Sequence, residues 1–403
     1  MEKIKSSSVL LITIILASLS TIAPFSIDTY LPSFPSIAYE LNATSIQMQQ
    51  SMSLYMLGFA IVTLFAGSIS DAYGRRNIAL LALFCYALAS FACVFVDTID
   101  SFLWLRFIQG AAASVGVVVG RAVVRDMFSG DEAQKMMSNV LLFFAMAPAL
   151  APIIGGALET SYGWRSVFIF LMLLAGAVLL LVFLKLPETL AKEERHSMHP
   201  VILLKNYSHA ITHKRFTIIA LVIAFNFSGF FIYVTASPRI IFTHLGLGAE
   251  EFYLMFVPIV VGVMLGSFLS GRLSGKVASM QLVKVGFIIM ALAVLLNLLQ
   301  AYFILHQAFT VIAPVVLYAV GMALSLPALT IMGLDHLPKH RGLASSLQSF
   351  LHMGGNAIVA GVITPLVFND LTHIALSMLV FLLIGFSLFI WIYPGFRTEP
   401  LDR

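Results

Sequence analysis

Residues 6–35 read SSSVLLITIILASLSTIAPFSIDTYLPSFP, an uncharged apolar run that meets its first charge at Asp28. A stretch of about 20 apolar residues is long enough to cross a bilayer as a helix. A carboxylate inside such a segment costs at least about 2.5–3.5 kcal/mol at the bilayer centre, so an acid found there is a candidate for binding protons. The alternative is that Asp28 simply ends the first helix at the outer interface.

The first 25 residues also resemble a secretory signal peptide. Lys3 and Lys5 precede the apolar run, and small residues occur between Ala17 and Ala23. An uncleaved first span has the same features. We favour the uncleaved span, because cleavage would discard the helix that carries Asp28.

The composition is that of a membrane protein. The 403 residues are 60% hydrophobic and 10% charged, with a mean hydropathy of +0.98, whereas soluble domains carry about 25% charged residues. A net charge of +4 could suggest a nucleic-acid partner. The basic residues instead lie in short loops between apolar segments, so we expect the lipid bilayer as the environment and no nucleic-acid partner.

Twelve apolar runs predict an all-α polytopic protein with both ends on one side of the membrane. The predicted spans are residues 9–37, 49–70, 77–96, 101–124, 136–158, 166–185, 216–240, 252–272, 283–304, 308–333, 342–367 and 373–394.

The basic residues fix the predicted orientation, because cytoplasmic loops carry an excess of lysine and arginine. Of the 23 lysines and arginines, 20 fall on the side of the N-terminus. Arg165 and Arg239 fall on the opposite side, and Arg106 lies within a span. The sequence therefore predicts a multi-pass protein of the bacterial inner membrane with both termini in the cytoplasm.

A charged, proline-containing stretch divides the spans six and six. It covers residues 187–215 and is predicted to be a cytoplasmic linker with a helix near residues 201–211. Residues 1–186 and 216–403 would then form two six-helix bundles, a known plan for transporters. The sequence GSISD at residues 67–71 is echoed by GRLSG at residues 271–275, which has no aspartate.

The stretch GSISDAYGRR at residues 67–76 is the most specific motif in the chain. It resembles the signature of the loop between helices two and three in the major facilitator superfamily. The resemblance implies the major facilitator fold and a gating or structural role for Gly67, Asp71, Gly74, Arg75 and Arg76. It also implies that Asp71 faces the start of helix eleven near residues 342–345, and that Arg75 pairs with Asp126. The alternative is a positively charged cytoplasmic turn with no further role.

LRFIQG at residues 105–110 resembles the helix-four motif of the same superfamily. Arg106 is charged and lies inside a span, so it needs an acceptor. Asp28 and the backbone carbonyls of the first helix are the available ones. A cation near Asp28 would keep the acid ionised and ready to accept a proton, so we expect a proton-coupling role for Asp28 and Arg106. The alternative is that Arg106 extends to the outer interface. Beyond it, the small residues Ala112, Gly116 and Gly120 predict a close helix contact.

APALAPIIGG at residues 147–156 resembles the helix-five motif of the superfamily's antiporters, with Pro148, Pro152, Gly155 and Gly156 in place. It departs from that motif at Ala147 and Ala151. PETL at residues 187–190 matches the end of helix six. Taken with IDTYLPSFP at residues 27–35, the chain is most similar to the twelve-span drug:proton antiporters of the bicyclomycin/chloramphenicol-resistance branch.

Side chains for binding cargo are predicted among aromatic and amide residues within the spans. The candidates are Tyr30, Tyr55, Phe59, Phe143, Asn226, Phe231, Tyr233, Phe256, Tyr318 and Gln348. Such residues more often pack or face lipid. His352 could relay protons, or it could be a hydrogen-bonded packing residue.

We expect no metal, because His336 and His340 do not have metal-ligand spacing. We also expect no cofactor. Cys85 and Cys93 would lie about 12 Å apart on one helix, too far for a disulfide.

The sequence therefore favours a secondary transporter, not an enzyme, that exports small amphipathic molecules in exchange for protons. We expect it to act as a monomer by alternating access. One alternative is a dedicated carrier of one metabolite or siderophore, working as an exporter or as an importer. Another is a sensor or scaffold with a transporter fold.

Overall fold

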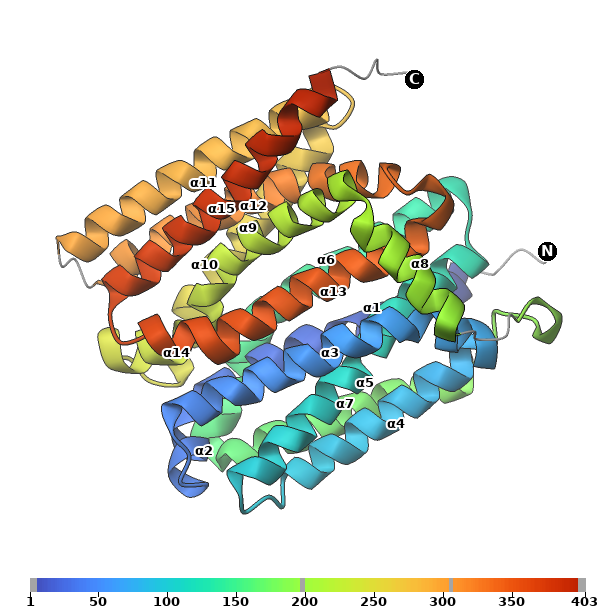
Figure 1. The fold of residues 1–403 in the computed structure, drawn as a ribbon. Helices are drawn as coiled ribbons and strands as arrows, with labels where there is room; N and C mark the ends of the chain where they lie inside the picture. Colours follow the sequence, from blue (N-terminus) through green and yellow to red (C-terminus); the bar gives the residue numbers. More distant parts are fainter. Residues whose placement is uncertain (1–5, 196–199, 304–306, 398–403) are drawn as a thin grey trace. The chain divides into compact units, whose positions relative to one another are not determined.

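The computed structural model describes residues 6–195, 200–303 and 307–397, and within those ranges it contains helices and no strand (Figure 1). Twelve of the described helical segments are long and apolar enough to cross a membrane. The predicted all-α, twelve-span fold is confirmed, and each predicted span overlaps one of these segments.

The chain divides into two units, which are described separately. Unit 1 contains the helices up to residue 199 and the short segment Gly248–Tyr253. Its helices are α1 (Ser6–Asp28), η1 (Leu31–Ser33), α2 (Phe34–Glu40), α3 (Ser45–Tyr73), α4 (Arg75–Cys93), α5 (Ile99–Met127), α6 (Gly130–Tyr162), α7 (Trp164–Lys185), η2 (Lys192–Glu194) and η4 (Glu250–Phe252).

Unit 2 contains the rest of the chain. Its helices are α8 (Pro200–Thr212), α9 (Lys214–Arg239), η3 (Ile240–His244), α10 (Tyr253–Leu273), α11 (Ser279–Tyr302), α12 (Ala308–Asp335), η5 (Pro338–His340), α13 (Arg341–Ile358), η6 (Val359–Ile363), α14 (Thr364–Val367) and α15 (Leu371–Arg397). Helix α8 lies where the linker helix is predicted and belongs to this unit.

The first span is broken where the sequence predicts one helix. Helix α1 ends at Asp28, and the chain continues through the 3₁₀ turn η1 into the short helix α2. Pro32 and Pro35 follow the break. Proline has no N–H to donate and its ring clashes with the preceding turn, so a regular helix cannot pass through these positions unchanged. The break leaves Asp28 at a helix end inside the span.

Glycines let the helices of unit 1 approach closely. A Cβ atom on Gly110 of α5 would overlap the backbone carbonyl of Tyr55 on α3. The predicted small-residue face of α5 lies against α1, where a Cβ atom on Gly116 would come within 2.8 Å of the Leu19 carbonyl. Close backbone contact of this kind stabilises helix pairs in lipid, where apolar burial gives little driving force.

Candidate functional site

Asp28 is the last residue of α1 and is 5% exposed. Among the described residues, none forms a hydrogen bond or ion pair with its carboxylate. Most buried polar groups in proteins have a partner. A buried acid that is not held by a fixed partner can change its protonation state without breaking up a bonded network.

Arg106 is fully buried and binds the end of α1 rather than Asp28. Its Nη2 donates to the Ser26 carbonyl at 3.0 Å, and its Nη1 lies 3.3 Å from Ser26 Oγ. The last carbonyls of a helix have no partner within the helix, and a cation there is favoured by the helix dipole. Arg106 therefore caps α1 two residues before Asp28. Of the two acceptors that the sequence allowed, the structure has the backbone carbonyl.

Two tyrosines enclose the guanidinium of Arg106. Its central carbon lies 4.1 Å from the ring centroid of Tyr30 and 4.6 Å from that of Tyr55. Both rings are fully buried, and desolvated cation–π contacts contribute about 2 kcal/mol. The hydroxyl of Tyr30 lies 3.2 Å from Ser51 Oγ, and that of Tyr55 donates to the Ala23 carbonyl at 3.3 Å. These tyrosines hold Arg106 in place.

A second hydrogen-bond chain leads from Arg106 to α4. Its Nη1 donates to Gln109 Oε1 at 2.8 Å, and Gln109 Nε2 donates to Ser90 Oγ at 2.7 Å. The motif at residues 105–110 contains the first two members, but nothing in the sequence pattern marked Ser26 or Ser90. A serine in an apolar helix is too common to mark such a role by itself.

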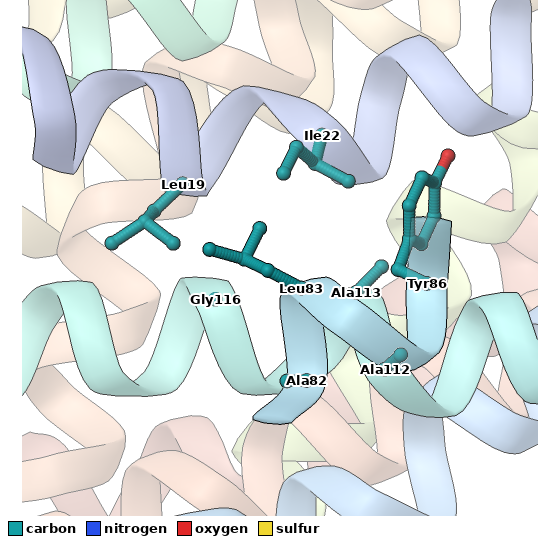
Figure 2. A pocket seen from close by; sticks show the side chains of 8 residues that line it. All are labelled: Leu19, Ile22, Ala82, Leu83, Tyr86, Ala112, Ala113 and Gly116. Carbon is teal, nitrogen blue, oxygen red and sulfur yellow. The ribbon is translucent and has the colours of Figure 1, made fainter. Parts of the chain in front are cut away.

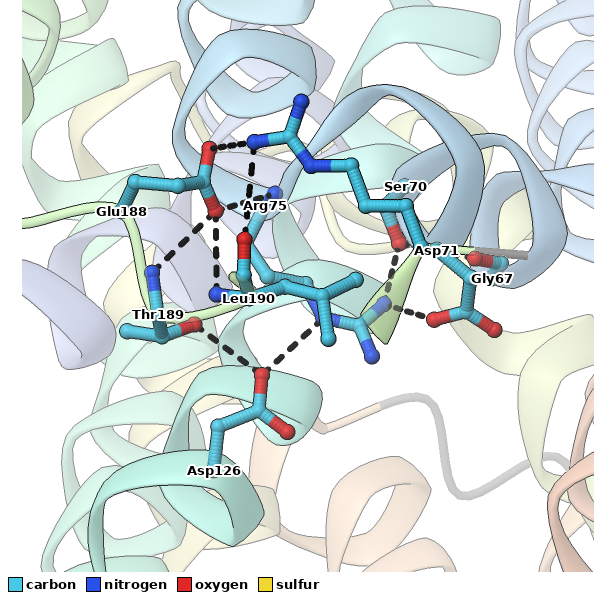
Figure 3. Close-up of polar contacts among 9 residues, drawn as sticks. Gly67, Ser70, Asp71, Arg75, Asp126, Glu188, Thr189 and Leu190 are labelled. Atoms are coloured by element: carbon cyan, nitrogen blue, oxygen red, sulfur yellow. Dashed lines mark hydrogen bonds and ion pairs between the residues drawn. The ribbon is translucent and has the colours of Figure 1, made fainter. Parts of the chain in front are cut away.

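At the other end of the unit 1 helices, Arg75 joins α3, α4 and α5 (Figure 3). Its Nε lies 3.1 Å from Asp126 Oδ2, the pair that the family resemblance implied. Its Nη1 forms an ion pair with Asp71 and donates to Ser70 Oγ at 2.6 Å. Arg75 is 8% exposed, so its charge is better shielded from solvent than that of a surface ion pair.

Glu188 extends this network to the segment after α7 (Figure 3). One of its oxygens accepts from the backbone N–H groups of Arg75 at 2.8 Å, Thr189 at 3.1 Å and Leu190 at 3.3 Å. Its other oxygen lies 3.6 Å from Arg195. The PETL sequence at residues 187–190 matches a family motif, but nothing in that motif indicates that the glutamate binds the start of α4.

Gly74 is required at the turn between α3 and α4 for two reasons. Its φ of +97° is one that other residues rarely adopt. A Cβ atom there would also overlap the Glu188 carboxylate. Gly67, by contrast, has room for a side chain, since the nearest atom to its Cβ position lies 3.9 Å away.

The other two charged residues of the loop motif, Arg76 and Asp71, make different contacts. Arg76 is directed at α7, where its Nη2 donates to the Phe183 carbonyl at 2.6 Å. Asp71 is bound to Arg75 within unit 1. Its expected position opposite residues 342–345 concerns unit 2 and stays a prediction.

The helix-five motif lies on α6, which keeps both Pro148 and Pro152 within one helix. A Cβ atom on Gly155 would overlap the Thr29 carbonyl, and one on Gly156 would overlap the Ala249 carbonyl. The two glycines therefore let α6 contact the end of the first span on one side and the 248–253 segment on the other.

The predicted cargo residues fall in both units, and their shared cavity stays a prediction. In unit 1, Phe59 is buried and Phe143 is 47% exposed. In unit 2, Asn226, Phe231, Tyr233, Phe256, Tyr318 and Gln348 are all buried. The hydroxyl of Tyr233 accepts from Asn297 at 2.5 Å, and that of Tyr318 donates to the Asn226 carbonyl at 3.0 Å.

Asn226 and Gln348 differ from these tyrosines. Neither polar atom of the Asn226 side chain, nor Nε2 of Gln348, has a hydrogen-bond partner among the described residues. His352 packs edge-on against Phe227, with ring centroids 4.2 Å apart. This contact is one of packing, but His352 Nε2 has no hydrogen-bond partner among the described residues, so the hydrogen bond expected of a packing histidine is not seen at that atom.

Two hollows lie within single units. A void of about 10 Å³ lies between α1, α4 and α5, bounded by Leu19, Ile22, Leu83, Tyr86 and neighbouring small residues (Figure 2). It is about the size of one water molecule, too small for cargo. An apolar groove of about 590 Å³ lies between α11 and α15, with Lys284 and Tyr393 among its lining residues.

Within the described ranges, no group of three or more His, Cys, Asp or Glu side chains could hold a metal ion. His336 lies beside His213, with ring centroids 5.7 Å apart. Cys85 and Cys93 are free thiols.

The fold and the buried Asp28–Arg106 region define a polytopic helical membrane protein with charged groups inside its spans. Residues 16–360 match the family model of the Major Facilitator Superfamily. The chain belongs to this superfamily, within the drug-efflux branch that the sequence resembles, and is a multi-pass protein of the bacterial inner membrane.

Three curated relatives cover nearly the whole chain. It is 31% identical to the uncharacterized transporter YdgK of Bacillus subtilis over 92% of both chains. It is 30% identical to the bicyclomycin resistance protein homolog of Haemophilus influenzae over 91% of both. It is 24% identical to multidrug resistance protein D of Escherichia coli over 90% of both.

A solved structure shares the fold. The crystal structure of a D-xylose–proton symporter superimposes with a TM-score of 0.73. The match covers 95% of this chain and 97% of that one at 14% identity.

Proposed function

We propose that this protein is a proton-coupled exporter of small amphipathic compounds, with Asp28 as the site that binds the coupling proton. The observation that carries the proposal is the buried carboxylate of Asp28 at the end of α1. Arg106, which lies on another helix, binds this helix end through the Ser26 carbonyl. Relatives named for resistance to bicyclomycin and to multiple drugs support export over uptake of a nutrient.

Coupling needs a group for which proton and cargo compete. Deprotonated Asp28 attracts a cationic or hydrogen-bonding cargo, and protonation removes that attraction. An exporter would bind cargo from the cytoplasm at the ionised acid and release it outside when a proton arrives. No ATP is needed, because the proton gradient drives each return.

Arg106 holds the end of α1 in position both when Asp28 is ionised and when it is protonated. Its guanidinium remains bound to the Ser26 carbonyl and between the Tyr30 and Tyr55 rings. It therefore keeps a positive charge near Asp28 without forming a direct ion pair that protonation would have to break. Such a pair would compete with both proton and cargo.

The remaining assignments belong to the same proposal. Both termini lie in the cytoplasm, the protein works as a monomer, and residues 1–186 and 216–403 move as two bundles about residues 187–215. The Arg75 network stabilises one of the states between which the bundles alternate. The stronger cargo contacts among the predicted residues are Asn226, whose two side-chain polar atoms have no partner among the described residues, and Gln348, whose Nε2 has none.

The test is expression in an efflux-deficient bacterium with a broad toxicity panel, combined with proton-flux assays in everted vesicles. Resistance to several compounds, together with proton movement on adding them, is expected. A growth phenotype limited to one nutrient or iron source would favour the dedicated carrier. Binding without flux would favour a sensor.

A further inference from the structure

The broken end of the first span packs against α6, and polar residues occur on both segments at this contact. Thr29, Ser33 and Ser36 recur at spacings of four and three along the broken end of the first span. Gly155 and Glu159 lie one turn apart on α6. Because α6 packs against both α1 and η1, these two sets of residues lie along one helix contact, which we call the seam.

Direct contacts fix the seam at both ends. At its inner end, a Cβ atom on Gly155 would overlap the Thr29 carbonyl, so the two backbones touch. At its outer end, Ser36 Oγ donates a hydrogen bond to Glu159 Oε1. Thr29 directly follows Asp28 in the chain. The seam therefore runs from Glu159 to the residue beside Asp28.

The side-chain oxygens along the seam are buried and can form further hydrogen bonds. Thr29 and Ser33 are fully buried. Thr29 Oγ1, Ser33 Oγ and Glu159 Oε2 have no hydrogen-bond partner among the described residues. Each hydroxyl can donate one hydrogen bond and accept others, and buried water commonly joins such groups. A chain of hydrogen-bonded hydroxyls and water molecules can transfer a proton from one oxygen to the next with little movement of the side chains.

We propose that Glu159 is the outer proton-transfer residue, delivering protons along Ser36, Ser33 and Thr29 to Asp28. This rests on the proposed function, in which Asp28 must receive a proton from outside. A proton from outer water binds the Glu159 carboxylate. Each hydroxyl or water then accepts one proton and releases one, so that Asp28 gains a proton, Glu159 is ionised again, and nothing else is consumed.

The other acidic groups around this end of α6 lie on other elements, and two of them, Glu40 and Glu251, already have hydrogen-bond partners. Glu40 of α2 forms an ion pair with Arg165 of α7 and accepts from Trp164 Nε1 at 2.5 Å. Glu250 and Glu251 lie on η4, which packs against α6. Glu251 accepts from the Gly248 backbone N–H at 2.8 Å. Among these acids, Glu159 is the one bonded to a serine of the seam.

The test separates proton delivery from cargo handling in proteoliposomes of the full-length protein. Glu159→Gln should slow proton-driven uphill transport at least about tenfold; a positioned general acid or base contributes about 10²–10⁴-fold. Cargo-for-cargo exchange, which needs no net proton transfer, should stay within about twofold of wild type, as should the apparent affinity for cargo. Added azide or formate, as small diffusible acids, should partly restore the uphill rate.

Ser33→Ala provides a second variant, since it removes one hydroxyl of the seam and adds no bulk. It should reduce uphill transport while leaving exchange unchanged. Glu132→Gln, an exposed acid near the opposite end of α6, is the matched control and should behave as wild type. Equal loss of exchange and uphill transport in Glu159→Gln, or full uphill activity, would overturn the proposal. Absence of proton-coupled transport in the wild type would instead overturn the proposed function.

Discussion

Arg106 Nη2 lies 3.0 Å from the Ser26 carbonyl and donates to it, so that a buried cation caps α1 two residues before Asp28. The capped carbonyl is one that the end of α1 leaves without a helical partner. The neighbouring Phe25 carbonyl is already satisfied by the Thr29 N–H at 3.1 Å. The position of the Asp28 backbone thus depends on a side chain from α5.

Replacing Arg106 by lysine should impair transport strongly although the charge is kept. Lysine has no planar fork to bind the Ser26 carbonyl and Gln109 together, and its compact ammonium cannot stack between two rings in the same way. We expect uphill transport to fall at least about tenfold, measured in proteoliposomes at matched protein levels.

Arg125→Lys is the control, since Arg125 is an exposed residue near the end of the same helix. It should retain normal transport. A fully active Arg106→Lys protein would show that the fork and the stacking are dispensable, and would favour a role for Arg106 in packing alone.

Arg75→Ala should reduce transport more than it reduces cargo binding. The side chain joins Asp71, Ser70 and Asp126 at the end of unit 1 where α3 meets α4. Removing it should shift the balance between conformational states rather than remove cargo contacts. Asp71→Asn should act in the same direction. Transport rates and equilibrium binding of a radiolabelled cargo measure the two effects.

Arg125→Ala removes a nearby positive charge and should change neither quantity by more than about twofold. If Arg75→Ala weakened binding as much as transport, the network would have a direct part in the cargo site and the gating role would be wrong.

Gly110→Ala should destabilise the protein, because the added methyl group would overlap the Tyr55 backbone. Relief of the overlap would move Tyr55 away from Arg106. Overpacking of this kind costs about 1–3 kcal/mol. The midpoint of thermal unfolding in detergent should fall, and transport should fall with it.

Gly176→Ala is the matched control. Gly176 lies within α7, and no atom lies within 4 Å of its Cβ position. Alanine is a better helix former than glycine by about 0.8–1 kcal/mol, so this variant should be as stable as wild type or more stable. Equal destabilisation of both variants would mean that the α3–α5 contact is not responsible.

The sequence predicted the spans well because each is a long apolar run, and membrane insertion depends mainly on that property. It predicted the pair Arg75 and Asp126 only through a family motif. It left two acceptors for Arg106, Asp28 and the backbone carbonyls of the first helix, and it could not single out the Ser26 carbonyl, since a backbone acceptor leaves no mark in the side-chain pattern. The break after Asp28 was also missed, although Pro32 and Pro35 were visible, because hydropathy does not distinguish one long helix from two joined segments.

The proposed orientation can be checked by labelling single cysteines in a cysteine-free background. A cysteine at Ala43, in the turn before α3, should react with a membrane-impermeant reagent added to intact cells. A cysteine at Ala191, an exposed position after α7, should react only after the cells are opened. Labelling of position 191 in intact cells would contradict cytoplasmic termini.

Asp28→Asn should abolish proton-coupled transport. Asparagine resembles the protonated acid permanently, so it cannot take up or release the coupling proton. For a cationic compound, the wild-type affinity should fall as the medium is acidified, because proton and cargo compete for the same carboxylate. In Asp28→Asn, any remaining binding should no longer depend on pH in this way, as measured by equilibrium binding across a pH series.

Asp28→Glu keeps the charge but extends it by one methylene group, so we expect partial activity with the pH dependence retained. The comparison of Asn and Glu separates loss of the titrating group from a change of shape at the end of α1. Correct insertion is checked by the cysteine labelling pattern of each variant. An inserted Asp28→Asn protein that still drove uphill, pH-dependent export would place the coupling site elsewhere. The Glu159 route would then have no acceptor at its inner end.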